Sequence, residues 1–311
     1  MNAVLLEAPP VPTCEPVTST RALGACPVGN RPLAEQQKAQ CAQAGLQPVN
    51  SPETDRLCVR LPAASWVCAH DLEPFAHRSE AAAILRSPDG TVLAWLGTED
   101  RPPDKAESLE ASAESFAIVY GWDILRVNET LVGALGGDDI RGEVCDGVHR
   151  DGHLVLGEGS RLLPGVYIEG NAVIGRNCKI GPNCYIRGNT SIGDGCHIGQ
   201  AVEIKNALLM NGVSIGHLSY CGDSIVGEDT NFGAGTITAN FRHDGKNHRS
   251  MVDGTLVDTG RRKFGAIIGD DVHTGIHTSI YPGRKLWPHT WTRPGTVVRK
   301  DLREPPDPSR S

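Results

Sequence analysis

The sequence predicts a mixed α/β N-terminal part followed by a parallel β-helix built from hexapeptide repeats. The first observation is length, since 311 residues exceed the roughly 100–200 residues of a typical domain. The second is composition, because 13 of the 21 prolines precede residue 151 whereas 25 of the 36 glycines follow it. The third is a six-residue apolar repeat in the second half. We therefore expect an α/β domain over residues 1–137, a linker over 138–152, a repeat domain over 153–301 and a flexible tail over 302–311.

The first hundred residues carry signals for strands and for a helix. Residues 3–6, Ala-Val-Leu-Leu, indicate a short buried strand. A helix should begin with Pro32 in its first turn and end at Gly45, because proline favours the start of a helix and glycine the position after its end. Residues 87–90, Ser-Pro-Asp-Gly, should turn a hairpin whose two strands flank them at 83–85 and 91–96.

A second helix is predicted before the repeats begin. Apolar residues over 124–135 recur at helical spacing, and the pair Gly136 and Gly137 should end the helix.

Aliphatic residues then recur every six positions, and glycine often follows them directly. They are Leu156, Leu162, Ile168, Ile174, Ile180, Ile186, Ile192, Ile198 and Ile204. Six is neither a helical period nor a plain alternation. It is typical of a parallel β-helix, in which three hexapeptides make one triangular coil and each aliphatic side chain points inward.

Small and turn-forming residues mark the corners of these coils. Asparagine tolerates the left-handed backbone conformation, so corners are expected at Asn171, Asn177, Asn183 and Asn189. Small side chains should fill the inside of corners at Cys178, Cys184 and Cys196 as reduced thiols. Cys178 and Cys196 should stack in adjacent coils, because one coil has 18 residues.

The repeat slips once and then resumes at Val226. Val226 and Ile268 are 42 residues apart, which is seven periods, so the residues between them should preserve the phase. Residues 243–264 break the repeat and should project from the β-helix as a loop.

Composition excludes several classes of function. A net charge of −7 argues against nucleic-acid binding, which needs clustered positive charge. No run of 18 apolar residues exists that could span a membrane, and the N-terminus lacks the features of a signal peptide. We therefore expect a cytoplasmic protein with neither nucleic-acid nor membrane partners. The ten cysteines form no C-x-x-C pair, so a cysteine-bound metal is not expected.

Several motifs together resemble a known enzyme family. The repeat is similar to the left-handed β-helix acyltransferases, which are trimers with active sites between subunits. Residues 197–206, 214–220 (Ser-Ile-Gly-His-Leu-Ser-Tyr) and 231–240 resemble the acetyltransferase domain of the bifunctional glucosamine-1-phosphate acetyltransferase/uridylyltransferases. Residues 241–246 and 257–269 are more similar to the archaeal-type branch of that family, whose members are sugar-1-phosphate nucleotidylyltransferases fused to amino-sugar-1-phosphate acetyltransferases.

The resemblance implies a role for each matching residue. It makes His217 the general base that deprotonates a sugar amine. Tyr220, Asn231 and Asn240 would line the site for the sugar and acetyl-CoA, and Asn240 would also take part in catalysis. Phe241 and Ile276 would lie near acetyl-CoA, where bacterial members have tyrosine and serine. Arg187 and Lys205 would hold the sugar phosphate, and Lys246 would reach in from a neighbouring subunit of a homotrimer.

The chemistry agrees with these roles. An ammonium cannot attack a thioester, so a base that titrates near neutrality must first remove its proton. A phosphate calls for a guanidinium and an ammonium that converge on its oxygens. Backbone amides and an asparagine amide can stabilise the oxyanion that develops on the thioester. The expected activity is therefore acetyl transfer from acetyl-CoA to an amino-sugar 1-phosphate or a nucleotide-linked amino sugar, with no metal in the β-helix.

The N-terminal part resembles a shortened and eroded nucleotidyltransferase domain. Residues 7–14, which include three prolines, stand where that family has a glycine-rich phosphate loop, and proline has no N–H to offer a phosphate. Leu23 stands in place of the family's lysine. Asp71 is the one candidate for the metal-binding aspartate. We interpret this part as a structural or protein-binding remnant.

Three alternatives stay open. The N-terminal part could retain nucleotidyltransferase activity, or the whole protein could be a non-catalytic trimeric scaffold. The third alternative is a β-helix carbonic anhydrase with zinc held by His273, His277 and His289, although the spacing of these histidines does not match that family.

Overall fold

The computed structural model describes residues 1–7, 11–51, 56–78 and 82–306. It divides into two compact units, which are described separately. The first contains residues 1–11, 22–26 and 31–123, and the second contains residues 12–21, 27–30 and 124–311. Residues 8–10 of the loop that replaces the glycine-rich segment, and 307–311 of the predicted tail, lie outside the described residues.

The first unit is built on a six-stranded mixed sheet. Its strands, in spatial order, are β4 (Gln47–Val49), β1 (Asn2–Leu6), β5 (Cys58–Pro62), β8 (Val92–Gly97), β7 (Ala83–Arg86) and β9 (Glu107–Glu110). Strand β1 pairs in parallel with β4 and β5, whereas β7 and β8 form the antiparallel hairpin that the turn at 87–90 predicts. A small second sheet pairs β6 (Ser65–Trp66) with β10 (Phe116–Ala117).

Two helices accompany this sheet. Helix α1 (Leu33–Gln43) has Pro32 as its N-cap residue, and the left-handed Gly45 follows its C-cap, which confirms the predicted helix. The other helix is α2 (Ala69–Ala76). The short elements near the N-terminus are η1 (Pro12–Cys14), η2 (Leu23–Ala25), β2 (Pro27–Val28) and β3 (Arg31–Pro32).

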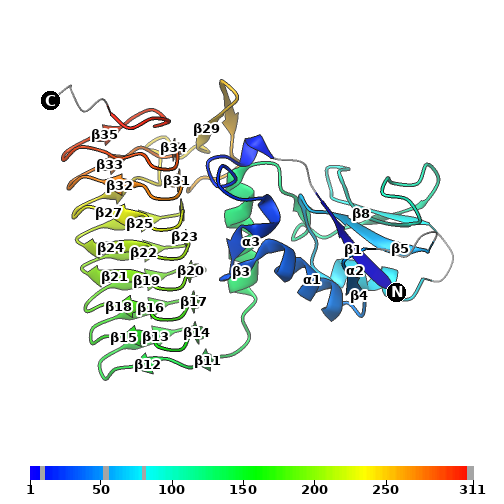
Figure 1. Ribbon diagram of the computed structural model, residues 1–311, viewed down its shortest axis with the longest axis horizontal. Coiled ribbons are helices and arrows are strands. Elements are labelled where there is room, and N and C mark those ends of the chain that lie inside the picture. The colour runs from blue at the N-terminus through cyan, green and yellow to red at the C-terminus, as the bar shows by residue number, and fades with distance from the viewer. Residues whose placement is uncertain (8–10, 52–55, 79–81, 307–311) are drawn as a thin grey trace. The chain divides into compact units, whose positions relative to one another are not determined.

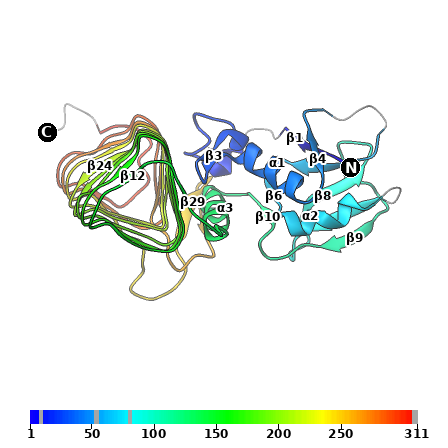
Figure 2. The same cartoon turned by 90° about the horizontal axis from the view of Figure 1, so that it is seen from below.

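The second unit is the predicted parallel β-helix, and Figure 2 shows its triangular cross-section. Its first face consists of β11 (Asp139–Ile140), β14 (Leu154–Leu156), β17 (Ala172–Ile174), β20 (Thr190–Ile192), β23 (Leu208–Leu209), β26 (Ile225–Val226), β31 (Ala266–Ile268) and β34 (Arg284–Leu286). Its second face consists of β12 (Glu143–Val144), β15 (Arg161–Leu162), β18 (Lys179–Ile180), β21 (His197–Gln200), β24 (Ser214–His217), β27 (Asn231–Phe232) and β32 (His273–Thr274). Its third face consists of β13 (His149–Asp151), β16 (Tyr167–Glu169), β19 (Tyr185–Arg187), β22 (Glu203–Lys205), β25 (Tyr220–Gly222), β28 (Ile237–Thr238), β33 (Ser279–Ile280) and β35 (Val297–Val298).

The aliphatic repeat forms the core of these coils, as predicted. Its residues are buried and belong to one continuous apolar cluster along the axis. Cys178 and Cys196 lie in this core in adjacent coils, where β18 pairs with β21. Val226 pairs with Ile268, so the phase is preserved as predicted. At roughly 25 cal/mol per Å² of buried apolar surface, this ladder is the main source of stability for the unit.

Residues 139–151, which the sequence analysis expects to be part of a linker, form the first coil instead. Their strands β11, β12 and β13 pair with β14, β15 and β16. A terminal coil has a neighbour on one side alone, so its composition departs from the repeat, and the apolar pattern there is too weak to predict.

All four predicted asparagines lie at corners between strands, but two of them lack the expected left-handed backbone. Asn177 and Asn183 have the expected left-handed backbone, with φ of 56° and 51°. In the coils of Asn171 and Asn189, it is the preceding glycines, Gly170 and Gly188, that take the positive φ. The Asn171 amide instead donates to the backbone oxygens of Val132 (3.0 Å) and Gly133 (3.3 Å), at the end of helix α3 (Gly121–Gly133). The helix therefore ends three residues before the predicted Gly136, where the β-helix satisfies its last carbonyls.

The segment that interrupts the repeat is an antiparallel hairpin rather than an irregular loop. Strands β29 (Arg249–Val252) and β30 (Thr255–Asp258) pair over four residues each. The hairpin projects from the coils, as Figures 1 and 2 show.

Among the described residues, no helix combines the length and the apolar character needed to cross a bilayer.

Candidate active site

Charged residues of the third face stack in a ladder from one coil to the next. Arg187 on β19 pairs with Lys205 on β22, and Lys205 pairs with Gly222, the residue before Asp223. Asp223 follows Gly222 at the corner that ends the third face, and its side chain contacts Lys205 of the preceding coil. The hexapeptide geometry therefore brings one cation directly against one carboxylate.

Asp223 is the centre of a buried polar network. Its side chain is 3% exposed, and both of its carboxylate oxygens accept hydrogen bonds from Lys205 Nζ, at 3.0 and 2.8 Å. The side-chain amides of Asn206 and Asn240 donate to the same carboxylate. Four donor contacts satisfy the charge of a carboxylate that would otherwise be costly to bury.

Asn240 joins this network to Tyr220. Its side-chain amide also donates to the Tyr220 hydroxyl at 2.8 Å. Burial, together with the carboxylates of Asp223 and Glu203, raises the pKa of Tyr220 to about 12. The phenol therefore keeps its proton near neutral pH and can donate it to a further acceptor. Gly222 is required beside it, because a Cβ at residue 222 would collide with the Tyr220 hydroxyl.

Arg187 lies in the same part of the third face, but a different carboxylate holds it. Its Nε donates to Glu203 at 2.7 Å, and its guanidinium lies 5.3 Å from the centre of the Tyr185 ring. Both side chains of the Arg187–Glu203 pair are about one third exposed, at 35% and 32%. Arg187 is thus accessible to a ligand, and Glu203 orients it.

His217 ends strand β24 on the second face, with an exposed side chain. Its backbone oxygen accepts a hydrogen bond from Ser219 Oγ at 2.7 Å, and Leu218 takes a positive φ of 51°. This local turn directs the chain from the second face to the third, so Tyr220 follows three residues later. In the preceding coil, burial lowers the pKa of His197, and the charges of Lys179 and His217 act in the same direction.

The remaining predicted residues lie on the surface of the second unit. Asn231 is exposed on β27, and Ile276 is 50% exposed two coils beyond His217. Phe241 is 49% exposed, with Lys263 Nζ 5.3 Å from the centre of its ring. Lys246 is exposed, and its backbone amide donates to Asp244 at 3.2 Å. In the described chain, no hydrogen bond or ion pair joins the side chains of these four residues to the Asp223 network.

The sequence analysis missed Asp223, although a signal for it exists. Counting 18 residues from Arg187 gives Lys205, and counting 18 more gives Asp223. The same count applied to charged residues elsewhere finds a second pair, Arg176 and Asp194, at 2.8 Å on the surface. At Arg176 and Asp194 the period aligns the two residues, whereas the coil after Lys205 is one residue shorter, so Lys205 pairs with Gly222 and reaches Asp223 one position further along.

Two of the three histidines proposed as zinc ligands are arranged around another carboxylate, Asp271. His273 Nε2 and His289 Nδ1 both contact Asp271, at 2.9 and 2.8 Å, whereas His277 has a left-handed backbone at a corner. Within the described residues, no group of three or more histidine, cysteine, aspartate or glutamate side chains is arranged to hold a metal ion.

In the first unit, Asp71 has a structural role. It lies in helix α2, buried, and not at the end of a strand. Its carboxylate accepts hydrogen bonds from the backbone amide of Ser112 (3.0 Å), the Ser112 hydroxyl (2.7 Å) and the Ser115 hydroxyl (2.6 Å). Asp71 thus ties the helix to the loop before β10, and both of its carboxylate oxygens take part in this contact.

Comparisons with known proteins agree with the motifs on the β-helix. Residues 154–290 match the family described as the GMPPB C-terminal domain. The bifunctional sugar-1-phosphate nucleotidylyltransferase/acetyltransferase of Sulfurisphaera tokodaii is 42% identical over 181 residues, which are 58% of this chain and 45% of that protein. The chain resembles these bifunctional enzymes. The bifunctional protein GlmU of Methanocaldococcus jannaschii is 39% identical over 181 residues, or 58% of this chain and 44% of its own length.

The match to these relatives is partial. The chain spans less than half the length of each of the two relatives. Among solved structures, a UDP-N-acetylglucosamine acyltransferase aligns with 52% of this chain and with 68% of its own chain length. The sequence identity is 13% and the TM-score is 0.26. The resemblance to the bifunctional family, stated from the motifs, is confirmed.

Proposed function

We propose that the chain is an acyl-CoA-dependent N-acetyltransferase that acts on an amino sugar, either a 1-phosphate or a nucleotide-linked form. The observation that carries this proposal is the network of Lys205, Asp223, Asn240 and Tyr220, which begins three residues after an exposed His217. The network supplies neutral hydrogen-bond donors and cationic groups at the end of the third face, and His217 supplies a base at the corner before that face begins. The partial match to proteins named as acetyltransferases supports the same activity.

In the proposed reaction, His217 removes a proton from the ammonium of the sugar. The free amine then attacks the thioester carbon of acetyl-CoA, the C–S bond breaks, and CoA leaves as its thiol after taking a proton. Asn240 is held by Asp223 and Tyr220, so its orientation is set before the substrates bind. Arg187 and Lys205 are proposed to contact the sugar phosphate, with Tyr220 and Asn231 on the sugar, and Phe241 and Ile276 beside acetyl-CoA.

The N-terminal unit is proposed to be structural or protein-binding. Near the ends of β1 and β5, where parallel sheets commonly place their ligands, lies a cavity of about 10 Å³ lined by residues that include Leu5, Leu33 and Pro62. That volume holds about one water molecule and no nucleotide. The bonds around Asp71 support the same proposal, because both of its carboxylate oxygens already accept hydrogen bonds within the protein.

The deciding experiment measures release of CoA thiol from acetyl-CoA with three acceptors: glucosamine, glucosamine 1-phosphate and UDP-linked glucosamine. Thiol release that depends on one of these amines is expected. A parallel reaction with UTP, Mg²⁺ and sugar 1-phosphates measures pyrophosphate. Pyrophosphate without thiol release would favour a retained nucleotidyltransferase, and neither product would favour a scaffold.

We also propose a homotrimer, in which Lys246 completes the site of a neighbouring subunit. The exposed apolar residues Leu218 (65%), Ile237 (39%) and Ile276 (50%) lie near the corner that carries His217, and a subunit interface would cover them. Light scattering should give a mass of three chains at micromolar concentration. A monomer that retains full activity would contradict the proposal.

A further inference from the structure

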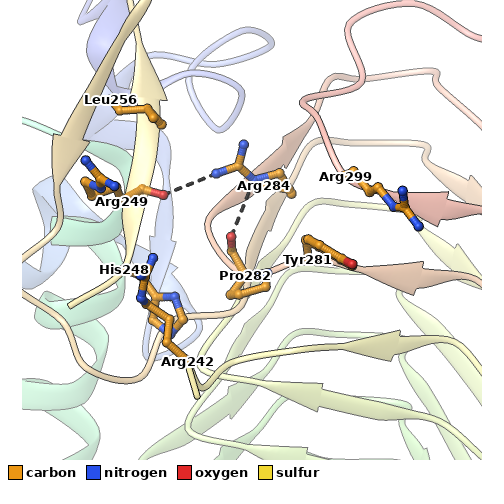
Figure 3. Close-up of a pocket in the computed structure, with 8 residues that line it drawn as sticks. All are labelled: Arg242, His248, Arg249, Leu256, Tyr281, Pro282, Arg284 and Arg299. Atoms are coloured by element: carbon orange, nitrogen blue, oxygen red, sulfur yellow. Dashed lines mark hydrogen bonds between the residues drawn. The ribbon is translucent and has the colours of Figure 1, made fainter. Parts of the chain in front are cut away.

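A cavity of about 250 Å³ lies between the hairpin β29–β30 and the last coils of the β-helix. Figure 3 shows its lining side chains, which come from the hairpin and its base on one side and from the coils on the other. They are Arg242, His248, Arg249, Leu256, Tyr281, Pro282, Arg284 and Arg299. Four of the eight are arginines and none is a carboxylate, so the cavity has a positive potential.

The arginines differ in how far their charge is compensated. Arg242 is paired with Asp244 by two hydrogen bonds of 2.8 and 2.6 Å, and Arg284 lies 3.9 Å from Asp301. Arg249 and Arg299 are exposed, and no carboxylate partner is found for either among the described residues. The Arg299 guanidinium lies 6.0 Å from the centre of the Tyr281 ring. Two of the four arginines that line the cavity thus have no carboxylate partner among the described residues.

Direct contacts fix the two walls of the cavity to each other. Arg284 donates to the backbone oxygen of Arg249 at 3.2 Å, as Figure 3 shows, and Ser250 Oγ donates to the backbone oxygen of Gly283 at 2.9 Å. Gly283 has a φ of +73°, and a Cβ there would lie 2.5 Å from the backbone oxygen of Arg249. Glycine is therefore needed at residue 283 for the hairpin to approach the last coils this closely. Because these contacts hold the two walls together, the cavity is preorganised.

His248 connects the cavity to the candidate active site. It is buried, and its Nε2 lies 2.9 Å from the backbone oxygen of Asn240. Burial lowers the pKa of His248, and the Arg242 charge acts in the same direction, against the Asn240 carbonyl and the carboxylates of Asp223 and Asp244. The imidazole is thus neutral near pH 7 and donates to Asn240 without adding charge. His248 and Asn240 thus link the cavity directly to the Asp223 network.

We propose that this cavity binds the phosphate end of a phosphorylated small molecule. Guanidinium groups bind phosphate oxygens through paired, charge-assisted hydrogen bonds, and the Tyr281 ring, Leu256 and Pro282 offer apolar surface to the organic part. The volume lies below the roughly 300–1,000 Å³ of pockets that hold a whole drug-sized ligand, so it suits one end of a larger molecule. This site is separate from Arg187 and Lys205, whose charges Glu203 and Asp223 already compensate.

The inference does not depend on acetyl transfer, because binding is measured directly. Calorimetry with pyrophosphate compares the wild-type protein with the double variant Arg249→Gln/Arg299→Gln. The matched control is Arg141→Gln/Arg161→Gln, which removes the same charge from exposed arginines of the first two coils. The dissociation constant for pyrophosphate should rise at least about tenfold in the first double variant and stay within about twofold in the control.

Two further titrations identify the source of the phosphate. A site for the acyl donor predicts that the Arg249/Arg299 variant loses affinity for CoA but not for 3′-dephospho-CoA. A site for the acceptor, which would replace Arg187 and Lys205 as the proposed ligands of the sugar phosphate, predicts a loss of affinity for glucosamine 1-phosphate but not for glucosamine. Wild-type protein that does not bind pyrophosphate at millimolar concentration would overturn the proposal, as would equal affinity in the wild type and the Arg249/Arg299 variant.

Discussion

Replacing His217 by alanine is expected to lower kcat for acetyl transfer by about 10²–10⁴-fold, the usual contribution of a general base. This corresponds to about 3–5 kcal/mol of activation free energy. The loss should fall mainly on kcat, because the base acts on the ammonium proton in the transition state and holds no other part of the substrate. Steady-state thiol release with the best acceptor measures it.

The fold of the His217→Ala variant should be unchanged. The side chain is exposed and contributes nothing to the aliphatic core, and the turn depends on the backbone oxygen of His217, which alanine retains. His149→Ala is the matched control, because His149 is an exposed histidine of the first coil, far along the ladder from Tyr220. Near wild-type kcat in His217→Ala, with thiol release intact, would show that the proposed base is wrong.

The core of the β-helix could be predicted from sequence because it depends on one repeated local rule. Each aliphatic residue occupies an equivalent inward position, so a single period predicts the strands, their parallel pairing and the resumption of the repeat after the hairpin. The corners were less predictable. Whether Asn171 turns the chain or bonds to helix α3 depends on what packs outside the coil, and the hexapeptide pattern carries no information about that.

The cavity was not predicted because its lining side chains come from segments that are distant in the sequence. Arg249 lies on the hairpin, Arg284 on the first face, and Arg299 follows β35 of the third face. No motif joins them in the sequence, because their convergence depends on how the hairpin folds back over the coils. Asp223 lies 18 residues after Lys205, but its coil is one residue shorter than the 18-residue repeat, so Gly222 holds the register position and the rule of the core does not place Asp223.

The Asp223 network also links helix α3 to the candidate site. Asn206 donates both to Asp223 and to Glu129 of α3, and Glu129 in turn pairs with Arg261 at the base of the hairpin. Helix, hairpin and coils therefore meet through charged and amide groups rather than through apolar packing alone. A change at Asp223 should affect both the stability of the unit and the orientation of Asn240.

Replacing Asp223 by alanine is expected to lower the free energy of unfolding by about 3–5 kcal/mol. The variant leaves the Lys205 ammonium, 16% exposed, without its partner, and a buried charge that loses its counter-charge carries this cost. Asn206 and Asn240 lose an acceptor at the same time. Urea-induced unfolding, followed by far-UV circular dichroism, measures the change.

Asp194→Ala is the matched control for this effect. Asp194 pairs with Arg176 across the same 18-residue interval, but the two side chains are 40% and 69% exposed. Such a surface pair contributes about 0–1 kcal/mol, so the control should unfold almost as the wild type does. The double variant Lys205→Met/Asp223→Leu removes both charges and should recover most of the lost stability, because apolar side chains can replace a buried ion pair. If Asp223→Ala and Asp194→Ala lower the free energy of unfolding equally, the cost comes from the corner geometry of the coil. The buried ion pair would then not be what holds Asn240 in place.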